Sequence, residues 1–314
     1  DYPGLDRHAD LLGCRYHEAS PDSRPMTVPQ VTIVIPTFNR SAMLRRCVES
    51  ALAQTQVCEV IVVDHGSSDD TPAVAASFGD RIRYLRRDVD HGVHFCWLDG
   101  VINARGKFIH LNFDDDFLQP TFVERCMALM SDDVALCFTV AEIRDEASGR
   151  KLQECFTGFG QTGVYSASRF MTLQIKGLVS PGAILLRRQD ILDVLFVGRV
   201  PFAQHEYRGV GPDWLMSAMA TLRYPKVGFI AEPLAVFSAH EGSITVDAQR
   251  DKAKKKALQA AYQAARRYYV VARAIKALRL DLLAGLGLFI LRVGARIAYG
   301  FHSLFNRKRT RETP

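Results

Sequence analysis

The sequence predicts an α/β protein whose mixed, mostly parallel sheet is flanked by helices. Two observations carry this prediction: short runs of β-branched residues alternate with segments of helical periodicity, and polar residues come directly after the strands. The 314 residues suffice for one large domain or two modest ones. A hydrophobic content of 48% and a charged content of 24% exclude the disordered, collagen-like and disulfide-scaffold classes.

The first half of the chain shows the clearest alternation. Strands are expected at 31–36, 59–64, 82–85 and 107–113, with helices at 41–53, 70–78 and 94–104. Leu44, Val48 and Leu52 lie at helical spacing, and Ser41 is the expected N-cap. Right-handed crossovers make such a sheet parallel, and ligands bind at the carboxyl ends of its strands. The polar residues at those ends are Asn39, Asp64, Ser67 and Asp114–Asp116.

The second half is more mixed and has a Gly-rich stretch at 158–163. Helices are expected at 121–130, after 211–213, and at 247–277. Strands are expected at 134–140, 179–188, 227–230 and 234–238. Residues 1–29 contain four prolines and no sustained periodicity, so we expect an irregular N-terminal arm.

The net charge of +6 is unevenly distributed along the chain. Residues 250–314 carry 16 Lys/Arg and 3 Asp/Glu, net +13, whereas residues 1–249 have a net charge of −7. A basic C-terminal region on an acidic body predicts contact with an anionic surface. We therefore divide the chain into the arm 1–29, a domain 30–246 and a basic helical region 247–314.

Residues 280–306 are almost entirely apolar or glycine, with a few polar residues close to one stripe. Their longest uncharged run, 282–291, is too short to span a bilayer. We expect an amphipathic helix at an anionic membrane surface, with burial against the body or a homodimer interface as the alternatives. Nucleic acid is not an expected partner, because interleaved Leu, Phe and Ile suit lipid better than base stacking.

The seven cysteines lack paired spacing and metal-ligand spacing. Together with a polar N-terminus that does not have the form of a signal peptide, they predict free thiols in a reducing cytoplasm.

Three adjacent carboxylates, Asp114–Asp116, follow the predicted strand 107–113. Such a cluster is costly unless a cation or hydrogen bonds compensate its charge. Mg²⁺ is usually held by one or two carboxylates together with substrate phosphates. The triplet therefore indicates a divalent-cation site, although carboxylates also favour exposed turns and helix N-termini.

The triplet belongs to an ordered series of motifs: VTIVIPTFNR (31–40), VIVVDHGSSDDT (60–71), HG (91–92), ARGKFIHLNFDDDFLQP (104–120), GPDWLMSAMA (211–220) and HEGSIT (240–245). This series resembles family 2 of the inverting glycosyltransferases. The resemblance implies a GT-A fold over 30–246, in which a nucleotide-binding half adjoins an acceptor-binding half. It also implies a sugar donor carried on a nucleoside diphosphate and a divalent cation, Mn²⁺ or Mg²⁺.

Carried over position by position, the resemblance implies a role for each of several groups. The donor-binding residues would be Pro36, Thr37, Phe38, Asn39, Asp64, His65, Asp114 and Asp116. Asp115 and His240 would lie at the metal. Ser180, Pro181, Gly182 and Trp214 would lie on the acceptor side, and Asp213 would be the catalytic base. Asp213 is also a plausible helix N-cap from its position after Gly-Pro.

The sequence departs from the family pattern at several positions. His65 replaces the second Asp of the usual DDGS turn, and Phe113 takes the place of the first Asp of a DxD motif, which leaves Asp115 as the metal ligand. Pro212 replaces the Glu before the base, and Ser238 replaces a common Arg two residues before His240. None of these changes removes the base, the metal aspartate or the histidine.

The resemblance predicts an inverting, metal-dependent transferase for cell-surface polysaccharide synthesis. The expected donor is a UDP-sugar, with GDP and dTDP as alternatives, and the expected acceptor is a glycan hydroxyl, lipid-linked in the first interpretation. Such an enzyme would be cytoplasmic and peripheral on the inner face of the cell membrane. The alternatives are a polyprenyl-phosphate glycosyltransferase, which would need no base, and a non-catalytic subunit that binds sugar nucleotides or glycans.

Overall fold

The computed structural model describes residues 29–195, 200–201, 210–240, 251–279, 282–283 and 286. Its strands are β1 Val31–Thr37, β2 Glu59–His65, β3 Arg83–Arg87, β4 Phe108–Leu111, β5 Phe117–Leu118, β6 Val134–Asp145, β7 Lys151–Cys155, β8 Gly163–Ser166, β9 Ile184–Arg187 and β10 Lys226–Ala239. Its α-helices are α1 Ser41–Leu52, α2 Thr71–Ala76, α3 Val93–Asn103, α4 Phe122–Met127, α5 Ala167–Lys176, α6 Arg188–Leu192, α7 Pro212–Ala220 and α9 Lys252–Ala277. Two 3₁₀ turns, η1 and η2, span Gly79–Arg81 and Pro181–Ala183.

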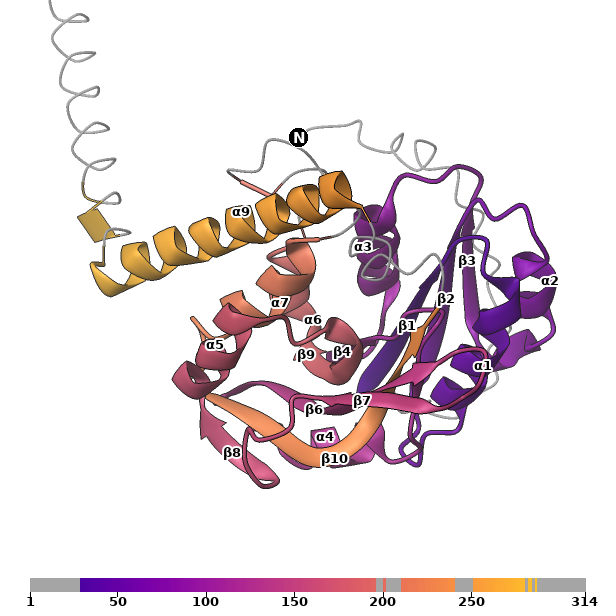
Figure 1. The fold of residues 1–314 in the computed structure, drawn as a ribbon, viewed down its shortest axis with the longest axis horizontal. Helices are drawn as coiled ribbons and strands as arrows, with labels where there is room; N and C mark the ends of the chain where they lie inside the picture. Colours follow the sequence, from indigo (N-terminus) through magenta and orange to yellow (C-terminus); the bar gives the residue numbers. More distant parts are fainter. Residues whose placement is uncertain are drawn as a thin grey trace, which may run out of the picture.

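The strands of this described part form one mixed sheet, in the order β3-β2-β1-β4-β9-β6-β10-β5 (Figure 1). Strands β3, β2, β1 and β4 run parallel to one another, as predicted. Strand β9 runs antiparallel to both β4 and β6, while β10 runs parallel to β6. Strands β7 and β8 pair with β6 and β10 off the main path. The predicted α/β class with a mixed, mostly parallel sheet flanked by helices is confirmed.

Strand β1 lies at the centre of the core because both of its faces are covered. Its residues are all buried, which explains the unbroken apolar run in the sequence. Val34 packs in one hydrophobic cluster with Trp97 of α3, and Ile33 packs in the opposite cluster with Leu44 of α1. The two helices thus cover opposite faces of the sheet at β1.

Several local expectations were wrong in detail. Ser41 is not the N-cap of α1: Arg40 occupies that position, and the carboxylate of Asp69 accepts the N–H of Ser41 at 3.0 Å. The two strands expected near 227–230 and 234–238 are one strand, β10, with irregular register around Pro233. The strand expected over 179–188 is reduced to β9, because η2 occupies its first part.

Helix α9 lies across one end of the molecule above α7 and extends past the body (Figure 1). Its middle part buries Ala261, Ala264, Ala265 and Tyr269, so part of the basic region 247–314 packs against the domain 30–246. The expected arm 1–29, save residue 29, and nearly all of the expected helix 280–306 lie outside the described residues. Among the helices of the described residues, none combines the length and apolar character needed to cross a bilayer.

Candidate active site

The carboxyl ends of β1, β2 and β4 lie side by side, as the sequence analysis predicted. The loop after β1 and the turn after β2 are tied together by hydrogen bonds. The backbone N–H of Asn39 donates to Ser67 Oγ at 2.9 Å, and the N–H of Ser68 donates to Asn39 Oδ1 at 2.8 Å. Asn39 has a φ of 53°, a left-handed conformation that Asn tolerates better than most residues. The preceding residue, Phe38, is 45% exposed at this edge of the sheet.

Asp114 lies at the end of β4, directly opposite the end of β1. The hydroxyl of Thr37 donates to Asp114 Oδ2 at 2.8 Å. Burial and the adjacent charge of Asp115 raise the pKa of Asp114 to about 7, although Arg40 and the hydrogen bonds from Thr37 and the Phe38 backbone oppose the rise. A carboxyl group near half-protonation can hydrogen-bond a ligand hydroxyl either as donor or as acceptor.

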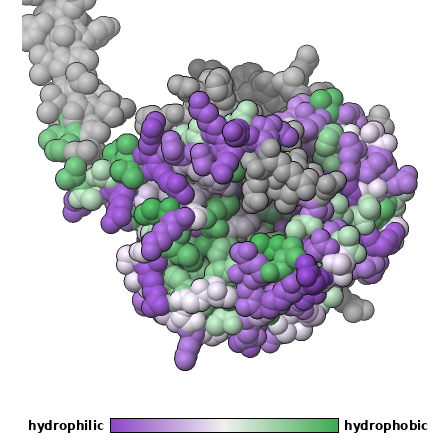
Figure 2. Space-filling view, viewed as in Figure 1, coloured by the Kyte–Doolittle hydropathy of each residue, from purple (hydrophilic) through white to green (hydrophobic). Residues whose placement is uncertain are grey.

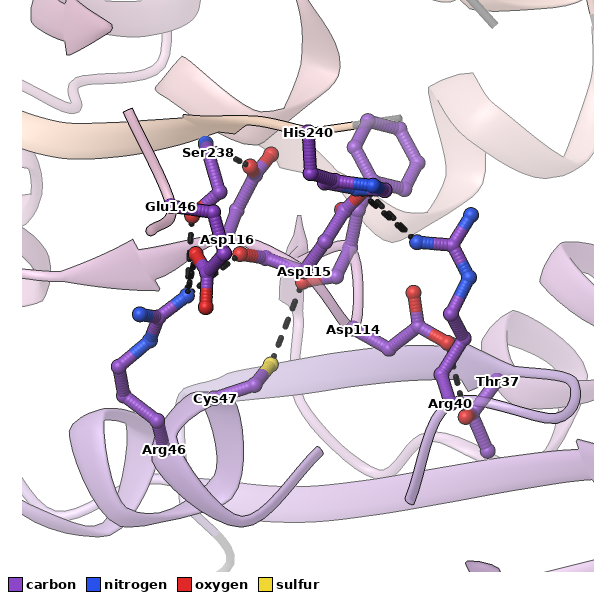
Figure 3. Close-up of polar contacts among 11 residues, drawn as sticks. Thr37, Arg40, Arg46, Cys47, Asp114, Asp115, Asp116, Glu146, Ser238 and His240 are labelled. Carbon is purple, nitrogen blue, oxygen red and sulfur yellow. Dashed lines mark hydrogen bonds and ion pairs between the residues drawn. The ribbon is translucent and has the colours of Figure 1, made fainter. Parts of the chain in front are cut away.

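Asp115 and His240 meet although 125 residues separate them (Figure 3). His240 Nε2 lies 2.9 Å from Asp115 Oδ2, and the guanidinium Nη1 of Arg40 lies 3.0 Å from the same nitrogen and 3.4 Å from the same oxygen. A cationic group thus already contacts the two residues expected at a metal. In the described residues no three His, Cys, Asp or Glu side chains are arranged to hold a metal ion. Mg²⁺ is usually held by one or two carboxylates together with substrate phosphates, and Asp115 could supply one such carboxylate beside His240.

Asp116 points away from Asp115 into the protein. Its Oδ1 accepts the backbone N–H of Ser238 at 3.0 Å, and the residue is 8% exposed. Burial and the charges of Asp115 and Asp114 raise the pKa of Asp116 well above its usual range, with the Ser238 hydrogen bond opposing. Asp116 therefore links β10 to residues 114–116, the aspartate turn, and helps to keep Asp115 close to His240.

Arg46 of α1 supports the aspartate turn from the opposite side (Figure 3). Its Nη2 donates to the backbone oxygen of Asp115 at 3.1 Å, to Ser238 Oγ at 2.9 Å and to Glu146 Oε2 at 2.7 Å. Ser238, at the position where the resemblance led us to expect an Arg, is one of the residues that this guanidinium contacts. Arg40 and Arg46 were not among the predicted site residues, because nothing in their local sequence distinguishes them from other surface arginines.

Asp64 and His65, expected at the donor, are both buried beneath the sheet edge. Asp64 accepts the N–H of Ser67 at 2.9 Å and the hydroxyl of Tyr84 at 2.6 Å, so its carboxylate organises the turn after β2. The His65 ring is 1% exposed, and its Nε2 lies 3.7 Å from Asp99, which Arg87 also holds. Because neither side chain is exposed, each could affect a bound nucleotide only indirectly, through the position of the turn after β2.

The segment expected on the acceptor side connects the two halves of the site. Ser180 caps η2 through a hydrogen bond from the N–H of Gly182 to its Oγ, and Pro181 is the first residue of the turn. A β-carbon at Gly182 would lie 3.5 Å from Asp116 Oδ2 and 3.1 Å from the ring of Phe237. η2 packs against both β4 and α7, and so connects the strand that precedes Asp114 with the helix that carries Asp213.

Asp213 begins α7 and is 8% exposed. Its Oδ1 accepts the N–H groups of Gly211 and Trp214, both at 2.7 Å, and its Oδ2 accepts the hydroxyl of Tyr262 at 3.1 Å. Burial raises the pKa of Asp213 from 3.8 to about 6, against the lowering effect of these hydrogen bonds. A carboxylate with a pKa just below neutrality suits a general base.

Trp214, also expected on the acceptor side, has no exposed surface. Its indole N–H donates to the backbone oxygen of Gln174 at 2.9 Å, and its ring packs edge-on against Tyr269 of α9. Any contribution of Trp214 to acceptor binding is therefore indirect, through the position of α7.

The six cysteines within the described residues are free thiols, as expected. Cys47 lies within the site, where Asn112 donates to its sulfur at 3.1 Å and the thiol donates to the Phe113 backbone oxygen at 3.3 Å. Burial, and then the three aspartates, raise the pKa of Cys47 well above its ordinary value. The thiol therefore stays protonated and packs as a small apolar group.

Comparison with known proteins identifies relatives of this arrangement. The model of the family described as "Glycosyl transferase family 2" matches residues 32–196, more than half of the chain. An uncharacterized glycosyltransferase of Rickettsia prowazekii is 36% identical over 104 residues, which are 33% of this chain and 32% of that protein. The succinoglycan biosynthesis protein ExoO of Rhizobium meliloti is 39% identical over 100 residues, 31% of this chain and 29% of the relative. The matched stretches thus span only about a third of the curated relatives.

A solved structure, S. aureus TarS residues 1–349 in complex with UDP-GlcNAc, has the same fold at a TM-score of 0.55. The alignment covers 68% of this chain and 60% of TarS, with 15% sequence identity. The fold, including the mixed sheet and its flanking helices, is accordingly the GT-A fold that the resemblance predicted. The family match ends at residue 196, before Asp213 and α9.

Proposed function

The chain belongs to glycosyl transferase family 2, and on that premise we propose that it is an inverting, metal-dependent glycosyltransferase. It would move a sugar from a nucleoside diphosphate, UDP in the first instance and GDP or dTDP otherwise, to a hydroxyl of a glycan acceptor. The observation that carries the proposal is the neighbourhood built by η2. This turn contacts Asp116 of the aspartate turn, which is suited to a donor and a cation, and it also packs against α7, the helix that carries the buried carboxylate of Asp213 with its raised pKa.

Donor binding would use the edge formed by β1 and β4. Pro36 and Thr37 end β1, and the exposed ring of Phe38 with the adjacent backbone of Asn39 offers a surface for a nucleoside. Asp114, held by Thr37 and able to donate or accept, suits a ribose hydroxyl. These contacts orient the donor without taking part in bond making.

Asp115 and His240 would hold Mn²⁺ or Mg²⁺ together with the diphosphate of the donor. A divalent cation, when bound there, neutralises charge on the departing nucleoside diphosphate as a Lewis acid. The guanidinium of Arg40 now contacts both residues and would have to withdraw from them on loading, after which it could meet a phosphate oxygen. Asp116 and Arg46 would keep the turn in place throughout.

Asp213 would act as the general base. It accepts the proton of the acceptor hydroxyl while that oxygen forms a bond to the anomeric carbon from the face opposite the leaving group. The bond from the anomeric carbon to the diphosphate oxygen breaks, and the nucleoside diphosphate leaves with the electron pair, which inverts the configuration. Ser180, Pro181 and Gly182 would line the acceptor side of this reaction, next to the aspartate turn.

One experiment tests the assignment of base and metal. Asp213→Asn should abolish transfer but keep metal-dependent nucleotide binding, whereas Asp115→Ala should abolish the Mn²⁺-dependent binding of UDP measured by calorimetry. Asp132→Ala, in the exposed turn before β6, is the matched control and should change neither. Normal turnover by Asp213→Asn, or undiminished UDP affinity in Asp115→Ala, would refute the corresponding role. A thermal-shift panel of UDP, GDP, dTDP and CDP with and without Mn²⁺ would identify the nucleotide.

We also propose that the acceptor is lipid-linked and that the protein works on the inner face of the cell membrane, in polysaccharide synthesis. Apolar side chains at the C-terminal end of α9 support this: Val271, Ile275 and Leu278 are 43%, 41% and 66% exposed, and hydrophobic residues gather there (Figure 2). Flotation with phosphatidylglycerol vesicles should be lost in Leu278→Asp but kept in Val57→Asp, a control 80% exposed on the loop before β2. Equal flotation of the two variants would contradict the membrane role.

A further inference from the structure

The middle of α9 packs against Gly211, two residues before Asp213. Gly211 has a φ of +107°, and a β-carbon there would lie 3.4 Å from the backbone oxygen of Ala261 and 3.8 Å from Ala265. Both alanines are buried. The positive φ favours glycine at position 211, and the small side chains of Ala261 and Ala265 let α9 pack against this turn before α7.

At this contact the two oxygens of Asp213 have different environments. Oδ1 is saturated by the backbone N–H groups of Gly211 and Trp214, which belong to the same turn. Oδ2 is met from outside that turn by the hydroxyl of Tyr262, at 3.1 Å. Two backbone bonds fix one oxygen, and the tyrosine then determines the rotation of the carboxyl group and the direction of the remaining lone pair of Oδ2.

We propose that Tyr262 of α9 is a positioning residue for the catalytic base Asp213. The inference rests on the proposed function, since it assigns a role relative to that base. It means that the active site extends beyond the segment matched by the family model and is completed by α9.

The chemistry of Tyr262 suits a permanent donor. Burial, and then the charge of Asp213, raise the pKa of Tyr262 far above its usual range, while the neighbouring Arg266 lowers it. The phenol therefore stays protonated at every working pH and always has its proton available for Oδ2. Among the charged side chains of the described residues, Asp213 from α7 and Arg266 from α9 are those that act on this hydroxyl.

A hydrogen bond to the ionised form of a carboxyl group lowers its pKa. The hydroxyl of Tyr262 contributes such a bond to Asp213, together with the two backbone N–H groups. Its removal should therefore raise the pH at which the base becomes active, while burial of Asp213 stays the same. A residue that merely fills space would not have this effect.

The test uses Tyr262→Phe in the full chain, with Tyr269→Phe as the matched control. Tyr269 is a buried tyrosine of the same helix, and its ring contact with Trp214 survives loss of the hydroxyl. The protonation midpoint of Asp213 is followed by carbon-13 NMR of aspartate labelled at Cγ, with Asp213→Asn to assign the resonance. We expect the midpoint to rise by about one pH unit in Tyr262→Phe and to stay unchanged in Tyr269→Phe. An unchanged midpoint in Tyr262→Phe overturns the inference.

Activity separates this inference from the proposed function on which it rests. UDP release from UDP-GlcNAc is measured as a function of pH. In Tyr262→Phe the acid limb of this profile should move to higher pH, with an unchanged KM for the donor. Loss of release in Asp213→Asn with an unshifted limb in Tyr262→Phe would overturn the positioning role alone. Undiminished UDP release by Asp213→Asn would show that Asp213 is not the base, and it would refute the proposed function.

If Tyr262→Phe does not fold, the wild-type protein supplies the same test. With tyrosine labelled at Cζ, one resonance should shift as the pH passes through the titration of Asp213 and should become pH-invariant in Asp213→Asn. The absence of such a resonance would equally overturn the inference.

Discussion

Replacing Asp213 by asparagine should stabilise the folded protein at neutral pH while it removes the base. The pKa of Asp213 is about 6 in the folded protein, raised chiefly by burial from an ordinary value of 3.8. Below pH 3.8 both the folded and the unfolded chains hold the proton, so the group has no effect on the pH dependence. Between these two values the unfolded chain loses the proton first, and the stability of the wild-type protein falls as the pH rises.

The size of the effect follows from the width of this window. About two pKa units at 1.36 kcal/mol per unit give ~3 kcal/mol, lost by the wild type between about pH 4 and pH 6. Asparagine has no such titration, and its carbonyl oxygen can still accept the N–H groups of Gly211 and Trp214. The free energy of unfolding of Asp213→Asn minus that of the wild type should therefore rise by ~3 kcal/mol across this range and then stay level.

Urea unfolding at a series of pH values from 4 to 8 measures this difference. Asp114 and Asp116 also titrate abnormally, but they are present in both proteins and cancel in the subtraction. Asp99→Asn is a control whose difference from the wild type should stay level over this range. Burial alone would raise the pKa of Asp99, but His65 and Arg87 hold it well below the usual range, so the stability that its charge contributes is already fully present above about pH 4. A pH-independent difference for Asp213→Asn would show that burial does not raise the pKa of Asp213, and the argument that this pKa suits a general base would fail.

Two glycine substitutions test the packing that builds the site. Gly106→Ala should destabilise the fold by about 1–3 kcal/mol in urea unfolding, because its β-carbon would lie 2.6 Å from the backbone nitrogen of Thr32. Gly177→Ala, where nothing lies within 4 Å, is the control, and equal losses would contradict the packing argument. Gly211→Ala should lower both stability, by about 1–3 kcal/mol, and UDP release, because alanine is strained at a φ of +107° and its β-carbon would lie 3.3 Å from Val200 Cγ2. Wild-type stability and release would show that the close packing at Gly211 is not critical.

The local pattern of the sequence was sufficient for the N-terminal half of the fold. Strands β1, β2 and β4 are continuous apolar runs that end in polar turns, and such runs form buried parallel strands whatever their distant partners are. The shorter strands β5, β7 and β8 were not predicted. Strands β7 and β8 are largely exposed, and β5 has two residues, so none has an apolar run of its own. Their conformation depends on pairing with β6 and β10.

Resemblance to a family pattern extended the sequence analysis to individual positions, but not to the environment of each side chain. Asp114, Asp115 and His240 were named in advance, and the structure brings all three to one edge of the sheet. Asp64 and Trp214 were named for ligand contact, and their burial could not be foreseen. Burial depends on which helices cover a residue, and a sequence motif does not contain that information.

The sequence by itself determined the α/β class, the order of the first strands and helices, and the clustering of carboxylates at one sheet edge. These features follow from the spacing of apolar residues and from the polar residues next to them, which act over a few positions. The tertiary structure alone decided that Arg40 meets His240 from 200 residues away and that Tyr262 reaches Asp213 from 49 residues away. Such contacts depend on how distant helices and strands pack together. The groups that tune the candidate base and the candidate metal site therefore become visible only in the folded protein.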